Sequence, residues 1–130
     1  MKCLSIRQPW AYLIMHHGKD IENRTWATTT RGRILIHASK GMTRQEYEDA
    51  LDFAYLECLA SGLQCEPDAL LRGGIIGSVE IVDCVTRSYS PWFQGPYGFV
   101  LRDPIALPFI PFRGALGFFN VPDDVLKGVA

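Results

Sequence analysis

Three residues in this sequence have side chains that could transfer protons in a hydrolytic reaction. Lys19 and Glu22 lie three positions apart, and Glu80 lies within the largely apolar segment 77–82. A carboxylate in such a segment either faces solvent or has polar partners, and Ser78 is on the same face of the expected strand. If the three groups converge, they could cleave an amide, an ester or a phosphodiester bond by acid–base catalysis. Lys19, Glu22 and Glu80 are therefore the candidate catalytic residues.

The position of Lys19 leaves two interpretations open. Lys19 follows Gly18, a residue suited to end a helix. It is either a solvated lysine, since lysine is rarely buried unpaired, or a lysine held near Glu22 or Glu80. Strict alternation along the expected strand would place Lys19 on the face opposite Glu22. The second interpretation therefore requires Lys19 to lie before the strand or at a bulge.

A second set of side chains is suited to binding rather than to chemistry. The N-terminus of a helix expected at Pro9 would offer free N–H groups to a phosphate or a carbonyl oxygen. Arginine and lysine could contact phosphates, and an aromatic ring such as that of Trp26 could stack on a base. The candidate ligand-binding residues are Arg7, Gln8, Pro9, Trp10, Arg24, Trp26, Arg31, Arg33, Ser39 and Lys40.

Each of these binding candidates also has a purely structural interpretation. Glu22 and Arg24 share one face of a strand, where they form either an exposed ion pair of little energetic value or a polar wall for a base edge. Trp10 is either a core residue or part of the site. The scattered arginines are either ordinary surface residues or the rim of a binding site.

The composition restricts the possible kinds of nucleic-acid binding. The chain has 130 residues, of which 48% are hydrophobic and 21% charged, so we expect one domain spanning residues 1–130 with a full core. The net charge is −1 and the isoelectric point is about 6.3. Proteins that hold long duplexes by neutralising phosphates are usually strongly basic. Any contact with nucleic acid must therefore come from a local patch or a pocket.

The cysteines and histidines give no sign of a metal site. No two of the four cysteines have the C-x-x-C spacing, and His16, His17 and His37 form no ligand pattern. We expect no metal and no cofactor. We expect the thiols to be reduced and mostly buried. The sequence has neither a visible secretory leader nor an apolar run of the ~20 residues that span a bilayer, which predicts a cytoplasmic protein without membrane contact.

The pattern of apolar residues predicts several short strands with helices inserted between them. We expect helices at Pro9–His17 and Thr43–Ser61, the second opened by a T-x-x-E capping box and buried along a stripe that includes Tyr55 and Leu59. Short helical turns are expected at residues 67–71 and 122–127. The expected strands are 2–7, 20–26, 33–38, 74–85, 97–101 and 116–120. Pro104, Pro108 and Pro111 predict that any strand after residue 101 is short or at an edge. Together these elements predict an α+β domain built on a small, mainly antiparallel β-barrel with the helices packed outside.

Several segments, in order along the chain, resemble the ASCH domain, the homology domain of activating signal cointegrator 1. They are Leu4–Ala11 (LSIRQPWA), Gly18–Arg24 (GKDIENR), Arg31–Arg33 with His37–Ser39, Gly77–Cys84 (GSVEIVDC) and a late Gly-Phe-Val segment. The resemblance implies a PUA-like β-barrel with a cleft beside the first helix. It also implies an association with RNA or other nucleic acid.

One bacterial branch of this family hydrolyses N4-acetylcytidine with a lysine base, a threonine nucleophile three residues later and a glutamate proton donor. The resemblance places Lys19 at the base and Glu80 at the donor, whereas Glu22 stands where that branch has its threonine. We therefore expect the cleft to bind RNA, single-stranded nucleic acid or a modified nucleoside. The alternative is a hydrolase, either an amidohydrolase of the acetylcytidine type or a ribonuclease. The sequence does not indicate any protein partner.

Overall fold

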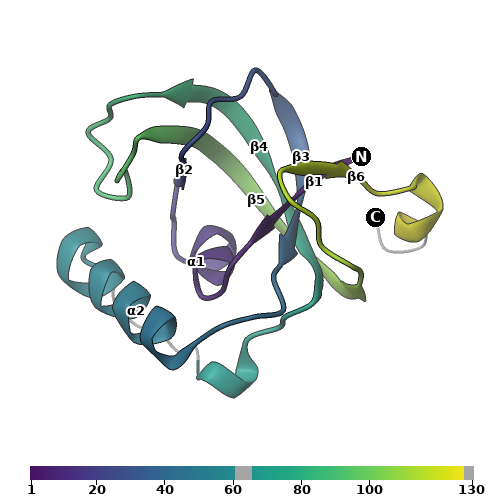
Figure 1. The fold of residues 1–130 in the computed structure, drawn as a ribbon, viewed down its shortest axis with the longest axis horizontal. Coiled ribbons are helices and arrows are strands. Elements are labelled where there is room, and N and C mark those ends of the chain that lie inside the picture. Colours follow the sequence, from purple (N-terminus) through teal and green to yellow (C-terminus); the bar gives the residue numbers. More distant parts are fainter. Residues whose placement is uncertain (61–65, 128–130) are drawn as a thin grey trace.

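The computed structural model describes residues 1–60 and 66–127, and six strands in it form one mixed sheet (Figure 1). The sheet order is β2-β5-β4-β3-β1-β6, and only the pairing of β1 with β3 is parallel. The strands are β1 (Lys2–Ile6), β2 (Ile21–Arg24), β3 (Gly32–Ala38), β4 (Gly74–Val85), β5 (Tyr97–Pro111) and β6 (Phe118–Asn120). The sheet curls into a half-barrel.

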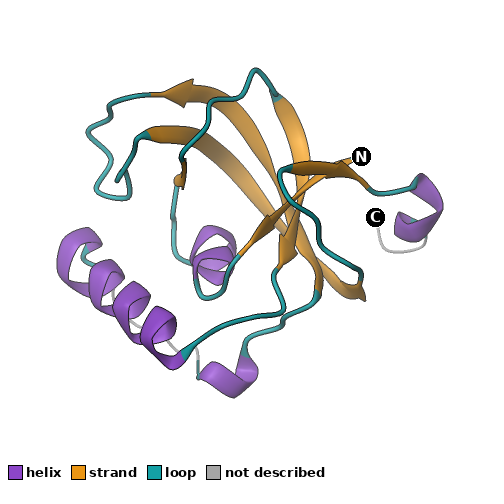
Figure 2. Ribbon diagram, viewed as in Figure 1, coloured by secondary structure: helices purple, strands orange, loops and turns teal. Residues whose placement is uncertain are grey.

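The helices lie outside the curled sheet (Figure 2). They are α1 (Trp10–His16) and α2 (Arg44–Cys58), and short 3-10 turns cover Pro67–Ala69 and Asp123–Leu126. This arrangement confirms the expected α+β, PUA-like fold with a mainly antiparallel sheet.

The main core lies between α1 and the inner face of the sheet. Ile14 and Met15 of α1 are buried against apolar side chains of β3, β4 and β5. Three aromatic rings extend this core between strands that are far apart in the sheet: Trp26 follows β2, Phe99 is in β5 and Phe118 is in β6. Phe118 stacks on Phe99 with ring centres 6.1 Å apart, and Trp26 contacts both rings edge-on. The rings therefore connect the β2 and β6 ends of the sheet.

Helix α2 begins as expected but is less buried than expected. The Thr43 side chain accepts from the Glu46 N–H, and the Glu46 carboxylate accepts from the Thr43 N–H, which confirms the capping box. The predicted buried stripe is confirmed at Ala50 and Ala54 but is wrong at Tyr55 and Leu59, which are 64% and 84% exposed. The helix lies at the periphery and contacts the body along a narrow line. The helix ends at Cys58, with Leu59 as a left-handed C-cap, so the predicted continuation through residue 60 is wrong, and the predicted last residue, 61, lies outside the described residues.

Strand β5 is longer than the prolines suggested, because one side of it is open. It runs through Pro104 and Pro108 to Pro111, so of the two expected alternatives, a short strand or an edge strand, the first does not apply. Among the strands of the described residues, β2 pairs with residues 97–100 of β5, and the later part of β5 pairs with β4 alone. A proline N atom at an open edge costs no ladder hydrogen bond. The expectation of an edge is therefore confirmed for this part of the strand.

We predict that Gly77→Ala destabilises the fold by about 1–3 kcal/mol, because Gly77 lets α1 approach β4 closely. A Cβ at this position would overlap the Met15 sulfur and lie 2.7 Å from the Ile105 carbonyl oxygen. Gly41→Ala is the matched control, since its nearest atom is the end of the flexible Arg7 side chain, 3.2 Å away. Urea denaturation measures both free energies of unfolding. An equal decrease in the free energy of unfolding in the two variants would contradict the tight contact between α1 and β4.

Candidate functional site

Lys19 is positioned by the end of α1. Gly18 has a left-handed backbone (φ +72°), and the Lys19 N–H donates back to the Leu13 carbonyl at 3.2 Å. Lys19 thus precedes β2, which begins at Ile21, and strand alternation does not restrict its direction. Its side chain is only 2% exposed. The interpretation of Lys19 as a solvated lysine is therefore wrong.

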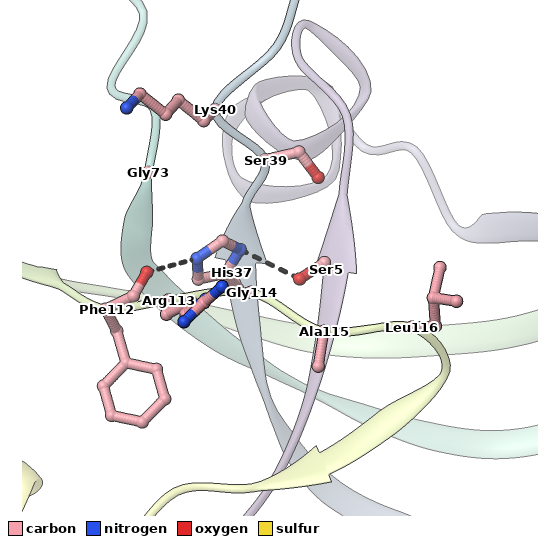
Figure 3. A pocket seen from close by; sticks show the side chains of 10 residues that line it. All are labelled: Ser5, His37, Ser39, Lys40, Gly73, Phe112, Arg113, Gly114, Ala115 and Leu116. Carbon is pink, nitrogen blue, oxygen red and sulfur yellow. Dashed lines mark hydrogen bonds between the residues drawn. The ribbon is translucent and has the colours of Figure 1, made fainter.

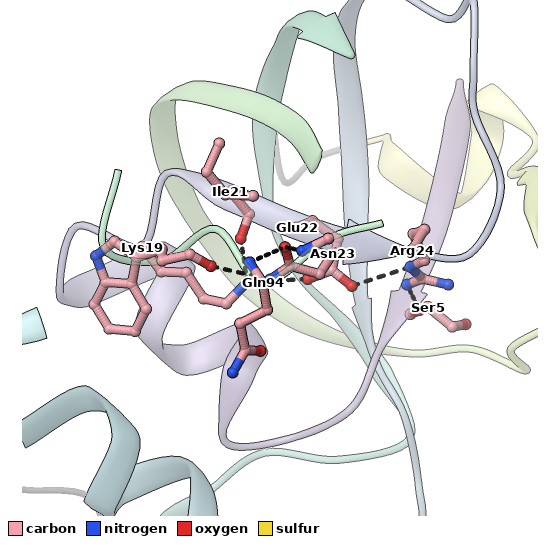
Figure 4. A network of polar contacts seen from close by, with 9 residues as sticks. Ser5, Lys19, Ile21, Glu22, Asn23, Arg24 and Gln94 are labelled. Carbon is pink, nitrogen blue, oxygen red and sulfur yellow. Dashed lines mark hydrogen bonds and ion pairs between the residues drawn. The ribbon is translucent and has the colours of Figure 1, made fainter. Parts of the chain in front are cut away.

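The Lys19 ammonium is held between three groups at the start of β2 (Figure 4). Its Nζ donates to the Ile21 carbonyl and to Glu22 Oε1, the latter at 3.2 Å. The same nitrogen lies 5.4 Å from the centre of the Trp10 ring, within cation–π range. Burial of the lysine is thus compensated by a carboxylate, a carbonyl and an aromatic face.

The Glu22 carboxylate continues the network to Arg24 and then to β1. Glu22 Oε2 accepts from Arg24 Nε at 3.0 Å, and Arg24 Nη2 donates to the Ser5 carbonyl at 2.8 Å. The Arg24 guanidinium also lies over the Trp26 ring, 5.9 Å from its centre. The Glu22 side chain is 10% exposed, so the interpretation of Glu22 and Arg24 as an exposed ion pair is wrong. The structure instead gives the polar wall that was the alternative.

This polar network borders a cleft of about 430 Å³ beside α1. The residues lining the cleft are Ser5, Ile6, Arg7, Trp10, Glu22, Asn23, Arg24, Thr25, Trp26 and Gly95. A smaller cavity of about 120 Å³ is formed by Trp10, Lys19, Glu22, Asn23 and Gln94. Trp10, Glu22 and Asn23 belong to both, so Lys19 borders a space adjoining the cleft.

Asn23 fixes a loop against the cleft, a role that the sequence analysis missed. Its Nδ2 donates to the Trp92 carbonyl at 3.0 Å, and its Oδ1 accepts from the N–H groups of Gln94 and Gly95 at 2.8 and 3.0 Å. These partners are about seventy residues away in the chain, and no local pattern relates them to Asn23. The only available signal was the Pro- and Gly-containing segment that precedes β5.

Glu80 lies elsewhere, with arginines from two neighbouring strands. Its flanking residues Val79 and Ile81 face the core against α1, so Glu80 points to the opposite face of β4. Arg102 Nε and Nη2 donate to its carboxylate at 2.9 and 3.3 Å, which lowers the pKa of Glu80 below its ordinary value. No contact found among the described residues connects Glu80 with Lys19 or Glu22. The three candidate catalytic residues do not form one cluster.

Arg33, Arg31 and Arg7, three of the predicted binding residues, are engaged with other parts of the protein. Arg33 donates to Ser78 Oγ at 3.0 Å, and Arg31 lies 3.6 Å from Asp83. Arg7 lines the cleft, but its guanidinium binds the Glu46 carboxylate and lowers the pKa of Glu46 to about 2. That pair attaches the start of α2 to the end of β1.

The remaining candidates near α1 and β3 divide between structural roles and a separate cavity. Gln8 is buried, with its amide donating to the Leu71 carbonyl and accepting from the Tyr12 N–H, both at 2.9 Å. Pro9 is buried at the start of α1. Ser39 and Lys40 line a different cavity from the cleft.

The cleft offers fixed hydrogen-bonding groups rather than a free base. Lys19 donates to two acceptors, whereas an amine acting as a base needs an available lone pair. An ionised carboxylate has about four acceptor positions, and the two contacts of Glu22 leave some of them available. Within residues 1–60 and 66–127, no group of three or more His, Cys, Asp and Glu residues is placed to hold a metal ion. No helix in those ranges is long and apolar enough to cross a membrane.

Comparison with known proteins gives consistent matches. The model of the ASCH domain family matches residues 4–99. Human activating signal cointegrator 1 is 30% identical over 136 aligned residues, covering 97% of this chain and 23% of the human protein. The mouse protein of that name is 34% identical over 86 residues, covering 65% of this chain and 14% of the mouse protein. The chain thus spans less than a quarter of the length of either relative.

We predict that Glu22→Gln destabilises the protein by about 3 kcal/mol, because it leaves the buried Lys19 ammonium without a counter-charge. Lys19→Met should cost less, since Glu22 keeps Arg24 as a partner. The double variant Lys19→Met/Glu22→Gln should be more stable than Glu22→Gln alone, because it removes the unpaired charge. Chemical denaturation of all three variants tests this order. A double variant less stable than Glu22→Gln would contradict the proposed importance of the buried ion pair.

Proposed function

Because this chain belongs to the ASCH domain family, which is PUA-like and commonly RNA-binding, we propose that its cleft binds single-stranded RNA or a nucleoside. The observation that carries the proposal is the prearranged Lys19–Glu22–Arg24 network on the wall of the cleft. Its donors and acceptors are fixed before any ligand arrives. Such preorganisation lowers the entropic cost of binding.

The network suits the edge of a base that carries an amino group. Glu22 can accept from an exocyclic N–H₂, as a carboxylate does from cytosine N4. Arg24 uses Nε for Glu22 and Nη2 for Ser5, and its remaining N–H groups can donate to a ring nitrogen or a carbonyl of the same base. Cytosine presents this order of donor and acceptors along one edge. Uracil presents an oxygen where cytosine has its amino group, and this oxygen would face the Glu22 carboxylate.

Two tryptophans flank the polar wall and can contact the faces of a base. Trp10 and Trp26 both line the cleft, and both are partly exposed. Stacking of a base on an aromatic side chain contributes about 1–3 kcal/mol in single-strand binding proteins. A cleft of about 430 Å³ is of the size that holds small ligands, so it suits one unstacked nucleotide better than a duplex.

We predict that Arg24→Ala weakens binding of an oligocytidine octaribonucleotide by about 1–3 kcal/mol, because the variant loses a charge-assisted hydrogen bond to the base. Oligouridine of the same length should bind wild type more weakly than oligocytidine. Fluorescence anisotropy titrations at fixed salt give both comparisons. Thermal melting of each variant separates a loss of binding from a loss of fold.

Arg33→Ala is the matched control for this experiment. Arg33 was also predicted to bind ligand, but it donates to Ser78 on the sheet face that carries Glu80. Under the present proposal Arg33→Ala binds oligocytidine as wild type does. Unchanged binding by Arg24→Ala together with weakened binding by Arg33→Ala would contradict the cleft and favour the other face.

The hydrolase alternative has one observation in its favour, the direct contact between Lys19 and Glu22. The separate position of Glu80 disfavours it, and hydrolysis stays the alternative to binding. A carboxylate at position 22 adds negative charge where an oxyanion would develop, whereas a threonine would not. We therefore predict that wild type leaves N4-acetylcytidine intact and that Glu22→Thr cleaves it if the domain derives from a hydrolase. Chromatographic separation of cytidine from N4-acetylcytidine after incubation with each protein measures the cleavage. Cleavage by wild type that is lost in Lys19→Ala would favour the hydrolase and contradict a purely binding role.

A further inference from the structure

A second, larger cavity of about 730 Å³ shares Ser5 with the cleft (Figure 3). It is formed where the end of β3, the start of β4 and the segment between β5 and β6 meet. The lining residues on which the inference depends are Ser5, His37, Ser39, Lys40, Arg113 and Leu116.

The charge of this cavity distinguishes it from the cleft. Lys40 and Arg113 both line it, and no aspartate or glutamate does. Among the described residues, neither the Lys40 ammonium nor the Arg113 guanidinium has an acidic partner, whereas Arg7, Arg24 and Arg102 each do. The two cationic residues give the lining of this cavity a net positive charge, which favours an anion.

The floor of the cavity is rigid and already hydrogen-bonded. The buried His37 ring donates from Nε2 to the Phe112 carbonyl at 2.7 Å, so its Nδ1, 3.0 Å from Ser5 Oγ, accepts from the Ser5 hydroxyl. Gly114 lies directly over this pair, because a Cβ there would be 2.7 Å from Ser5 Oγ and 2.8 Å from His37 Cε1. Gly114 and the neighbouring Arg113 both line the cavity.

Ser5 connects the two cavities. Its side chain contacts His37 at the floor of the larger cavity, and its carbonyl accepts from Arg24 at the wall of the cleft. Ser5 lines both spaces. A ligand that fills the cleft with a base and continues past Ser5 would bring its next charged group to Lys40 and Arg113.

We infer that the larger cavity is a phosphate-binding site for the strand whose base occupies the cleft, with Lys40 and Arg113 as its ligands. The inference rests on the proposed function for the identity of the strand. Lysine and arginine are the usual partners of phosphate oxygens in proteins. The nearly fully exposed Leu116 at the rim offers an apolar contact to the sugar or base next to that phosphate.

The test compares Lys40→Ala/Arg113→Ala with Arg87→Ala/Lys127→Ala. The control pair likewise removes one lysine and one arginine charge, at exposed positions that line neither cavity.

Each protein is titrated with an oligocytidine octaribonucleotide at several salt concentrations and, separately, with cytidine. The cavity variant should bind the oligonucleotide at least about tenfold more weakly. The slope of the logarithm of the association constant against the logarithm of the salt concentration should be shallower by about 0.7, because the contact with one phosphate is lost. Cytidine binding and the control pair should match wild type.

The outcomes separate this inference from the proposed function. If Arg24→Ala weakens oligonucleotide binding and the cavity variant does not, the inference of a phosphate site is wrong and the proposal that the cleft binds the base is supported. If only the cavity variant weakens oligonucleotide binding, the proposal that the cleft binds the base is wrong, and Lys40 and Arg113 form the principal binding site. Cytidine has no phosphate group. If the cavity variant also binds cytidine more weakly than wild type does, its effect does not come from a lost phosphate contact, and the inference is overturned. If wild type binds neither probe, both proposals are wrong.

Discussion

The arrangement of the cleft depends on the contacts of one group, the Glu22 carboxylate. One of its oxygens binds Lys19 at the end of α1, and the other binds Arg24, which reaches the Ser5 carbonyl of β1. Three elements are therefore oriented around one acidic side chain. Buried ion pairs contribute little net stability, because desolvation offsets much of their attraction. The value of this one is geometric: it holds two cations and an acceptor at fixed positions beside a space large enough for a nucleotide.

Much of the fold follows from local patterns. The T-x-x-E sequence at Thr43 marks the start of α2, and alternation along β4 identifies Val79 and Ile81 as core residues. Long-range features do not follow in the same way. The apolar stripe of α2 is exposed at Tyr55 and Leu59, since the sequence of a helix does not determine which of its apolar side chains the rest of the fold covers. The part of β5 that contains the prolines has no β2 strand beside it, because β2 begins only at Ile21, opposite Val100, a fact that the sequence of β5 does not contain.

The candidate site was predictable in its chemistry but only partly in its geometry. Lys19 and Glu22 were named as possible partners although strict strand alternation opposed a contact, and the left-handed Gly18 before Lys19 leaves Lys19 outside the strand. Glu80 could be assigned to the face of β4 opposite Val79, but alternation does not say which face borders the cleft. Asn23 and its loop partners, like Ser5 and His37, meet only through tertiary structure. Such pairs leave no spacing signal in a single sequence.

The open part of β5 has a consequence for the behaviour of the domain in a crowded solution. Unpaired strands at the edge of a sheet can template the addition of a strand from another chain, which is a common route to aggregation. Along residues 102–111 of β5, Pro104, Pro108 and Pro111 present no N–H group to an incoming strand. A foreign strand would find an interrupted row of donors there. The prolines that made this segment hard to recognise as a strand thus protect the longest exposed edge of the sheet.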